Sequence, residues 1–337
     1  MKSLKKDHLV SVLNSWAKHF RLLAPVKGIN GECIFNTFQE QDFTLDYKKP
    51  SLPPKSAFMP QSEILFEVEN DRYREVINAP KAMLFGIRAC DAAGLRQFAG
   101  FMSRDQEDVY YRSKTNETVT VVMACDGPQT ETCFCTTTKS GPYAKKAFDL
   151  QFYDTGDVFL IEAGSPRGEA LLSDKAFSDL DKAKAAEQIE RFKEKAVRAI
   201  PVREAVEKAM GSLKEGAVGE DVWEYFGKKC IACGGCVYVC PTCTCFNVYD
   251  EVSGPGRGKR VRAWDTCLFG GFTREASGHN PRPDQKSRLK RRHEHKLLYY
   301  NTLDVGDMLC GCVGCGRCSD YCPVHIGTLE VTEAISG

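Results

Sequence analysis

Apolar residues in the first half of the chain fall into short runs that polar or small residues separate. Residues 81–90 (KAMLFGIRAC) and 117–125 (ETVTVVMAC) are two such runs, and each ends at a cysteine. Both are typical of buried strands. Residues 91–101 between them have helical periodicity, and Asp91 is suited to cap that helix. Two strand-like runs in 148–164 surround a Thr-Gly-Asp turn, which predicts a hairpin.

Helical periodicity is also clear at the start and in the middle of the chain. Apolar positions in residues 9–20 recur at intervals of four, three and four, which predicts an amphipathic helix. Residues 172–212 are rich in Ala, Lys and Glu and carry an apolar stripe, which favours a connecting helical segment. The first 20 residues do not read as a secretory signal, and no run of about 18 apolar residues occurs. We therefore expect a cytoplasmic protein without a membrane span.

Cysteine content changes this picture, because the chain has 17 cysteines in 337 residues. Five lie in residues 1–229 and twelve in residues 230–337. Disulfides are rare in the cytoplasm, so clustered cysteines there favour metal binding or redox chemistry. The net charge of +1 gives no indication of a nucleic-acid or membrane-surface protein.

Most of the C-terminal cysteines form two copies of one motif, C-x2-C-x2-C-x3-C-P. The first copy is Cys230, Cys233, Cys236 and Cys240, and the second is Cys312, Cys315, Cys318 and Cys322. This is the bacterial ferredoxin run, in which the fourth cysteine typically ligates the other cluster. We expect two [4Fe–4S] clusters with crossed ligands: Cys230, Cys233, Cys236 and Cys322 for cluster 1, and Cys312, Cys315, Cys318 and Cys240 for cluster 2.

Zinc is the alternative for such a cysteine pattern. A structural zinc site uses two separated pairs of ligands, and a third cysteine at x2 spacing followed by a fourth at x3 has no place in it. The 71 residues of 241–311 separate the two copies, which favours a mainly helical di-cluster domain over a compact β-hairpin ferredoxin. Neither motif supplies an acid, a base or an open ligand position. We therefore predict no catalytic residue and expect one-electron transfer.

Seven further cysteines raise the prospect of additional sites. Four lie at or near the ends of predicted strands, where loops gather at one edge of a sheet, and could hold a third cluster: Cys90, Cys125, Cys133 and Cys135. Three lie outside the ferredoxin pattern and are either buried structural thiols, a further cluster or a redox-active thiol site: Cys243, Cys245 and Cys267. Cys310 is expected to be a non-ligand neighbour of the second motif, and Cys33 a structural thiol.

Other candidate motifs are weaker. Residues 254–260 (GPGRGKR) fail the phosphate-loop pattern, because Ser253 stands where Gly is needed and Arg260 where Ser or Thr is needed. We expect neither a flavin nor a nucleotide on this chain. The basic run 286–296 favours a solvated helix or a face that docks an acidic partner over a nucleic-acid patch, and His293 and His295 within it are expected to face solvent.

In combination, these motifs resemble one family. "GIRACDAAGLRQF", the later "CFC" and "DTGDVFLIEAGSPRG" precede "CGGCVYVCPTCTCFNVYD", "GRGKRVRAWDTC" and "CVGCGRCSDYCP". In this order they resemble the iron–sulfur subunit of anaerobic sulfite reductase and the related beta subunit of the sulfhydrogenase-type soluble nickel–iron hydrogenases. The resemblance covers roughly residues 60–325.

The resemblance implies an electron-transfer subunit that has no substrate site of its own. One implied partner is a ferredoxin-reductase-like subunit with FAD, which takes electrons from NAD(P)H. The other is a catalytic subunit, either a sirohaem sulfite reductase or a nickel–iron hydrogenase. The resemblance also favours the third cluster, because the family has cysteines at those four positions. It matches Cys243, Cys245 and Cys267 too, without naming a role for them.

The fold prediction is a mixed α/β N-terminal domain, or α+β overall, followed by an α-helical ferredoxin-type di-cluster domain. The expected units are residues 1–180 with the third cluster, a helical connection at 181–222, and the two-cluster domain at 223–337. An alternative function makes the chain catalytic, with disulfide or polysulfide reduction at Cys243 and Cys245 or at the N-terminal cluster. The sequence leaves sulfite, protons and a disulfide open as terminal acceptor.

Overall fold

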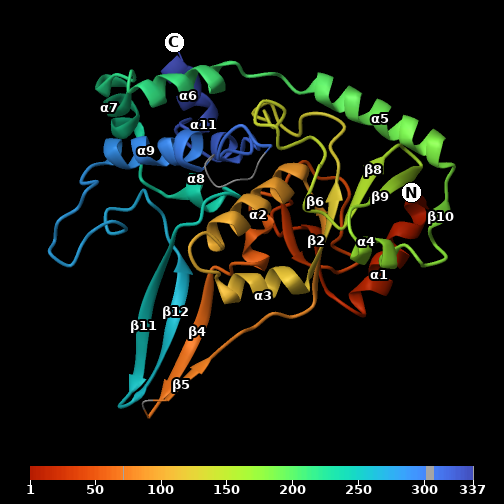
Figure 1. Ribbon diagram of the computed structural model, residues 1–337, viewed down its shortest axis with the longest axis horizontal. Coiled ribbons are helices and arrows are strands. Elements are labelled where there is room, and N and C mark those ends of the chain that lie inside the picture. Colours follow the sequence, from red (N-terminus) through yellow and green to blue (C-terminus); the bar gives the residue numbers. More distant parts are fainter. Residues whose placement is uncertain (71, 301–306, 337) are drawn as a thin grey trace.

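An eight-stranded sheet forms the centre of the N-terminal region (Figure 1). The computed structural model describes residues 1–70, 72–300 and 307–336. The strand order is β10-β1-β9-β8-β7-β6-β2-β3, with β2, β6, β7 and β8 parallel. The strands are β1 (Lys2–Lys5), β2 (Arg21–Lys27), β3 (Cys33–Thr37), β6 (Ala82–Ile87), β7 (Thr118–Met123), β8 (Leu150–Asp154), β9 (Val158–Ala163) and β10 (Ser178–Asp179).

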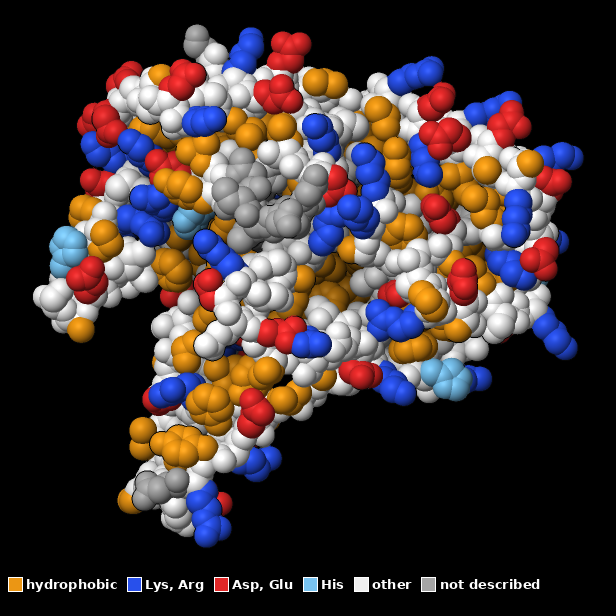
Figure 2. Space-filling model, viewed as in Figure 1, with side chains coloured by type: hydrophobic (Ala, Val, Ile, Leu, Met, Phe, Trp, Pro, Cys, Tyr) orange, Lys and Arg blue, Asp and Glu red, His pale blue; other side chains and the backbone are white. Residues whose placement is uncertain are grey.

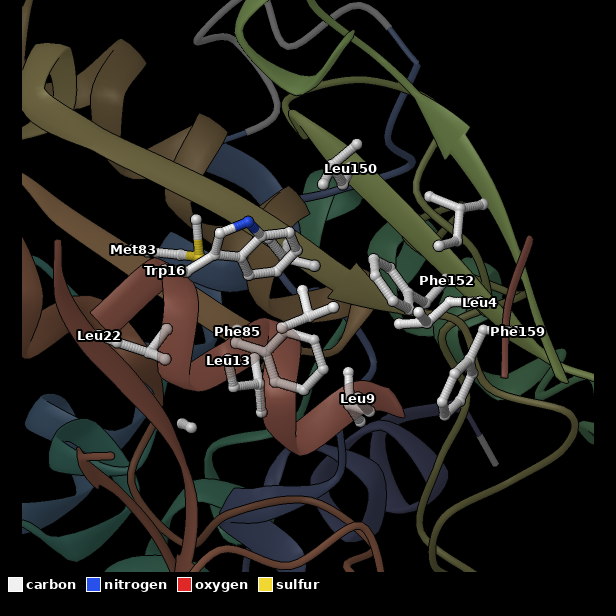
Figure 3. Packing of buried hydrophobic residues seen from close by; sticks show 14 of the residues in the cluster. Leu4, Leu9, Leu13, Trp16, Leu22, Met83, Phe85, Leu150, Phe152 and Phe159 are labelled. Atoms are coloured by element: carbon white, nitrogen blue, oxygen red, sulfur yellow. The ribbon is translucent and has the colours of Figure 1, made fainter. Parts of the chain in front are cut away.

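Helices cover both faces of this sheet because its central strands are apolar on both sides. Helix α1 (Leu9–Ala17) packs on one face, where Leu13 and Trp16 contact the buried side chains that point from β6, β7 and β8 (Figure 3). Helices α2 (Ala89–Met102) and α3 (Val109–Glu117) cover the other face. The short helix α4 (Pro166–Leu171) follows β9.

The predicted strands and helices of this region are confirmed. The runs at 81–90 and 117–125 form β6 and β7, and 148–164 forms the antiparallel pair β8 and β9. Asp91 lies three residues inside α2 rather than before it, and its carboxylate accepts a hydrogen bond from the Arg88 backbone N–H at 3.2 Å. That contact is one half of a capping box, so Asp91 does stabilise the start of the helix.

The C-terminal region is built mainly from helices, which Figure 1 shows gathered beside the sheet. Helix α5 (Lys182–Ala199) leads from the sheet into this region; α6 then packs on α11, and α7 packs on α9. The further helices are α6 (Ala205–Glu215), α7 (Glu220–Lys229), α8 (Gly235–Tyr238), α9 (Gln285–Glu294), the π-helix η3 (His295–Tyr299), α10 (Arg317–Asp320) and α11 (Thr328–Ser336). No helix among the described residues is both long and apolar enough to cross a bilayer.

A second sheet of four strands extends from the body as an arm (Figures 1 and 2). Its order is β11-β12-β4-β5, with β4 (Ser62–Glu69), β5 (Arg72–Glu75), β11 (Phe246–Gly254) and β12 (Arg257–Trp264). The arm joins the two halves of the chain, because β12 from the C-terminal half pairs with β4 from the N-terminal half. At its root, the buried Arg262 guanidinium forms ion pairs with Glu63 and Asp108.

The predicted fold class is therefore confirmed: an α/β N-terminal region precedes a mainly helical region with the cysteine motifs. The arm is the element that the sequence analysis did not foresee. The two-cluster domain is mainly helical as expected, but part of the insertion between the two motifs forms the β11–β12 hairpin. Because this hairpin pairs with an N-terminal strand, the division at 1–180, 181–222 and 223–337 stays a prediction.

Candidate iron–sulfur site

The two cysteine motifs have the same backbone conformation. Ala232 and Gly314, each directly before the second cysteine of its motif, have φ angles of 55° and 57°. Gly234 and Gly316, each directly after that cysteine, have φ angles of 73° and 72°. These angles lie in the left-handed region, which explains glycine at three of the four positions. The repeated sequence therefore folds into a repeated loop.

The loops direct backbone N–H groups at the sulfur atoms. In each copy, the residue two positions after the first cysteine donates to that cysteine's Sγ at 3.4 Å, from Ala232 to Cys230 and from Gly314 to Cys312. Ile326 and Thr328 donate in the same way to the Sγ atoms of Cys322 and Cys318, both at 3.3 Å. Such donors stabilise negative charge on thiolates and help to set the reduction potential of a cluster.

Four thiols line one cavity near the surface. We call them thiol set 1: Cys230, Cys233, Cys236 and Cys322. Three come from the first motif and the fourth from the end of the second motif. Burial raises the pKa of Cys236 to about 11; Arg292 opposes this shift, and the thiols of Cys318, Cys230 and Cys322 add to it. Four thiols are the donor set that an iron–sulfur cluster needs, and Cys233 among them is exposed.

A second group of thiols lies deeper. We call it thiol set 2: Cys240, Cys312, Cys315 and Cys318. Burial raises the pKa of Cys315 to about 11; Arg317 and Lys49 lower it, whereas the neighbouring thiols of Cys240 and Cys318 raise it. Burial raises the pKa of Cys312 as well, with contributions from Cys318 and Cys315. The structure thus brings Cys240 of the first motif to the cysteines of the second.

The four candidate cysteines of the N-terminal region also lie together. We call them thiol set 3: Cys90, Cys125, Cys133 and Cys135. Burial raises the pKa of Cys135, and the first two thiols that add to this shift are Cys125 and Cys133. Cys90 is linked to Cys135 in the same way. The first turn of α2 and the segment that follows β7 therefore bring these cysteines to the carboxyl edge of β6 and β7.

Single residues connect the three sets in series. Cys318 of set 2 is a neighbour of Cys236 in set 1. Burial is the main reason why the pKa of Cys236 is raised, and the charge of the Cys318 thiolate raises it further. Cys315 of set 2 is in the same way a neighbour of Cys90 and Cys135 in set 3, and its charge raises the pKa of both thiols. Set 2 therefore lies between sets 1 and 3. Within the described residues, no three His, Cys, Asp or Glu side chains are arranged to hold a single metal ion.

The remaining thiols differ in their surroundings. The thiols of Cys245 and Cys267 are neighbours, and the thiol of Cys243 is a neighbour of that of Cys240. Cys243 and Cys245, the pair expected in the alternative function, are therefore each closest to a different partner. Cys310 is buried, and its thiol donates to the Cys312 carbonyl oxygen at 3.7 Å. Cys33 lies half-buried on β3.

The basic run 286–296 contradicts one expectation. His293 was expected to face solvent, but it is fully buried between helices: Nδ1 donates to the Leu289 carbonyl oxygen at 2.9 Å, and Nε2 lies 3.0 Å from the Arg292 guanidinium. Arg292 and Lys296 on the same face are also buried. The physical reason is that these cations face the thiol sets rather than water. Their spacing with Leu289 and Leu297 was the signal for a buried face.

Buried cations also lie between sets 2 and 3, and the sequence analysis did not foresee them. The Lys49 ammonium donates to the Cys315 carbonyl oxygen, lies 3.9 Å from the Cys133 Sγ and forms an ion pair with Asp320 at 2.7 Å. Arg317, within the second motif, pairs with Asp91, the residue after Cys90. Positive charge next to cysteine sulfur favours an anionic cluster there.

Comparison with known proteins agrees with this geometry. Residues 229–326 match the family model described as a 4Fe-4S dicluster domain. The chain carries a 4Fe-4S dicluster domain. Over 336 residues it is 29% identical to sulfhydrogenase 2 subunit beta of Pyrococcus furiosus, an alignment that spans 98% of this chain and 97% of that one. No solved structure matches.

The predicted resemblance to sulfhydrogenase-type iron–sulfur subunits is therefore confirmed, and the dicluster domain supports [4Fe–4S] clusters in the C-terminal region. Together these matches indicate an iron–sulfur electron-transfer subunit. The ligand assignments, the third cluster and the sulfite reductase half of the resemblance stay predictions.

Proposed function

We propose that this chain relays single electrons through a row of [4Fe–4S] clusters inside a multi-subunit oxidoreductase. The observation that carries this proposal is the series of thiol sets 1, 2 and 3, in which Cys318 and Cys315 link each set to the next. Neighbouring ligands keep the distance between successive clusters short. A row of closely spaced one-electron centres without an acid, base or open ligand position is suited to conduction.

Thiol set 1 holds cluster 1 and thiol set 2 holds cluster 2 in this proposal. The crossed arrangement, in which Cys322 serves the first motif and Cys240 the second, is supported by the lining of the set 1 cavity and by the neighbours of Cys315. The backbone N–H donors and the buried cations stabilise the added negative charge when each cluster is reduced. Thiol set 3 holds a third cluster of the same kind.

The two ends of the row have different surroundings, which suits two partners. At the set 1 end, Ile231 and Tyr321 line the cavity and are 61% and 50% exposed beside the exposed Cys233. An apolar surface next to a cluster edge suits a partner that exchanges electrons there. At the set 3 end, a separate pocket is lined by Arg88, Ala124 and Asp126, next to Cys125.

The partners in this proposal are an FAD-containing reductase subunit linked to NAD(P)H and a catalytic subunit. Similarity to a sulfhydrogenase subunit favours a nickel–iron hydrogenase as that catalytic subunit over a sirohaem sulfite reductase. This chain itself carries no flavin or nucleotide in the proposal.

Two measurements test this proposal. The chain purified without oxygen should hold at least about eight irons, and about twelve with the third cluster, because each cubane contains four. A chain that holds far fewer than eight irons after anaerobic reconstitution would contradict the relay.

Affinity purification of the complex from its native cells should bring down a flavoprotein together with nickel, whereas sirohaem in place of nickel would assign the catalytic subunit to sulfite reduction.

A further inference from the structure

Cys243, Cys245 and Cys267 gather at the root of the arm. Cys245 directly precedes β11, and Cys267 follows β12 by three residues, so the paired ends of the hairpin hold both thiols at its base. The Asp265 N–H donates to the Cys245 carbonyl oxygen at 3.1 Å, and the thiols of Cys245 and Cys267 are neighbours. Cys243 and Cys267 are buried, and Cys245 is partly buried. Three thiols from two separate segments therefore belong to the same buried cluster, with Cys243 and Cys267 inside it and Cys245 packed against it.

This group touches the ligands of both clusters in the dicluster domain. The Cys243 N–H donates to the carbonyl oxygen of Cys240 in set 2 at 3.4 Å, and the two thiols are neighbours. Cys267 has Cys236 of set 1 among its neighbours. The three thiols therefore lie beside sets 1 and 2, on the side that faces the arm. None of them is needed for the two ferredoxin motifs.

Three buried cations surround the same group. The Lys55 ammonium donates to the carbonyl oxygens of Cys243 and Val237 at 3.2 and 3.3 Å, and lies 4.4 Å from the centre of the Trp264 ring. The Lys296 ammonium donates to the Thr242 hydroxyl at 2.8 Å. The hydrogen-bond acceptors of both ammonium groups are thus uncharged.

Arg292 is the third cation. Its guanidinium donates to the Cys236 carbonyl oxygen at 3.3 Å, whereas its buried Nε has no hydrogen-bond partner. None of Lys55, Lys296 and Arg292 forms an ion pair with a carboxylate in the part of the chain that the structure describes.

Buried charges need opposite charge, because an unpaired ion in a protein interior is strongly unfavourable. Clusters 1 and 2 supply part of that charge, since Arg292 lies at the Cys236 loop and Lys296 next to Cys240. Lys55 lies instead against the loop of Cys243. Burial lowers the pKa of Lys55, whereas nearby thiolates at Cys243, Cys240 and Cys245 would raise it. With neutral thiols at Cys243 and Cys245, the ammonium would have only the charge of cluster 2 at Cys240 besides dipoles. Thiolates that bind metal at Cys243 and Cys245 would supply further negative charge directly beside Lys55.

We propose that Cys243, Cys245 and Cys267 ligate a further iron–sulfur centre between the dicluster and the root of the arm. The choice of iron–sulfur chemistry rests on the proposed function, because the centre shares its surroundings with the ligands of clusters 1 and 2. Three thiolates leave at least one iron position to a ligand other than these cysteines. The centre would form a branch of the electron path toward the β11–β12 hairpin.

Iron and acid-labile sulfide counts on the intact chain test this inference. The Cys245→Ser/Cys267→Ser variant, purified without oxygen, should hold at least about two irons fewer per chain than the wild type, because the smallest cluster has two. Its electron paramagnetic resonance (EPR) signals from clusters 1 and 2 should remain. Cys33→Ser is the matched control and should retain the full iron content.

An unchanged iron count in the folded double variant would overturn the inference. If the double variant does not fold, the Cys125→Ser/Cys133→Ser variant decides, because it removes thiol set 3 and leaves the arm intact. More than about eight irons in that variant supports the further centre, and eight or fewer overturns it. Failure of the relay proposal looks different: Cys322→Ser and Cys240→Ser would then leave the iron count and the EPR signals unchanged.

Discussion

Arg317 and Asp91 form a fully buried ion pair with an N–O distance of 2.7 Å. Arg317 lies between two cysteines of the second ferredoxin motif, and Asp91 follows the first cysteine of thiol set 3. The Arg317 side chain also donates to the Pro50 carbonyl oxygen at 2.8 Å. One interaction thus joins the dicluster domain to the N-terminal sheet at the point where sets 2 and 3 meet.

We expect Asp91→Asn to lower the free energy of unfolding by about 3–5 kcal/mol, because it leaves the Arg317 charge buried without a partner. Urea unfolding under anaerobic conditions measures this change. Asp250→Asn, which breaks the exposed pair with Arg260 on the arm, should leave stability almost unchanged. Equal effects of the two substitutions would show that the buried pair has no special role.

Gly316→Ala should prevent the second loop from forming. A Cβ atom at Gly316 would lie 2.5 Å from the Thr132 backbone oxygen, in a residue whose φ is already 72°. The variant should lose the iron of cluster 2 and more than about 3 kcal/mol of stability. Gly278→Ala is the matched control, because Gly278 has a φ of 86° but open space around it. It should cost only about 1–2 kcal/mol and keep all iron.

Crossed ligation predicts how single variants group by their EPR spectra. Cys322→Ser should alter the same cluster signal as Cys230→Ser, although the two residues belong to different motifs. Cys240→Ser should alter the same signal as Cys312→Ser. If Cys240→Ser groups with Cys230→Ser instead, each motif holds its own cluster.

Lys49→Met should lower the reduction potentials of clusters 2 and 3, because it removes positive charge next to Cys315 and Cys133 and leaves the Asp320 carboxylate without its partner. A shift of about 60 mV for one electron corresponds to about 1.4 kcal/mol. Redox titration monitored by EPR measures the shift. Cluster 1 is the internal control, and an equal change in its potential would argue against a local charge effect.

Because His293 is buried, we expect the free energy of unfolding to decrease in mild acid. Burial, followed by the nearby Arg292 charge, lowers the pKa of His293 to about 3. The unfolded chain takes up a proton at the ordinary pKa near 6.5, so the contribution of His293 is complete above that pH and decreases as the pH falls toward 3. At pH 5.5 the loss is on the order of 1 kcal/mol.

Urea unfolding at pH 7.5 and pH 5.5 should therefore show a larger difference for the wild type than for His293→Gln. Glutamine keeps a donor and an acceptor but does not titrate in this range. If the free energy of unfolding changes equally between the two pH values in both proteins, protonation of His293 does not cause the loss of stability.

Local patterns predicted much of the fold, and they suggested the grouping of the cysteines into three sets, which stays a prediction. The strands at 81–90 and 117–125 and the helix between them follow from local periodicity. The doubled motif needs no tertiary information either, because its spacing alone specifies the loop. Cys90, Cys125, Cys133 and Cys135 could be grouped because parallel strands bring their carboxyl ends to one edge of a sheet.

Long-range contacts account for what the sequence did not reveal. Strand β12 pairs with β4, about 200 residues earlier in the chain, and no local pattern specifies that partner. The charged run at 286–296 has the composition of a solvated helix, yet Arg292 and Lys296 are buried. In the proposed relay, the negative charge of the neighbouring clusters compensates these two cations. Composition alone does not distinguish a cation that faces water from one that faces a cluster.

The most direct test of the electron relay is a reductive titration of the anaerobically purified chain, with EPR spectra recorded as a low-potential donor is added. We predict that the chain takes up at least two electrons in one-electron steps, and that the spectra of the reduced clusters show magnetic coupling because the thiol sets are neighbours. A chain that contains its iron but takes up no electrons, or that shows only isolated uncoupled clusters, would contradict the account.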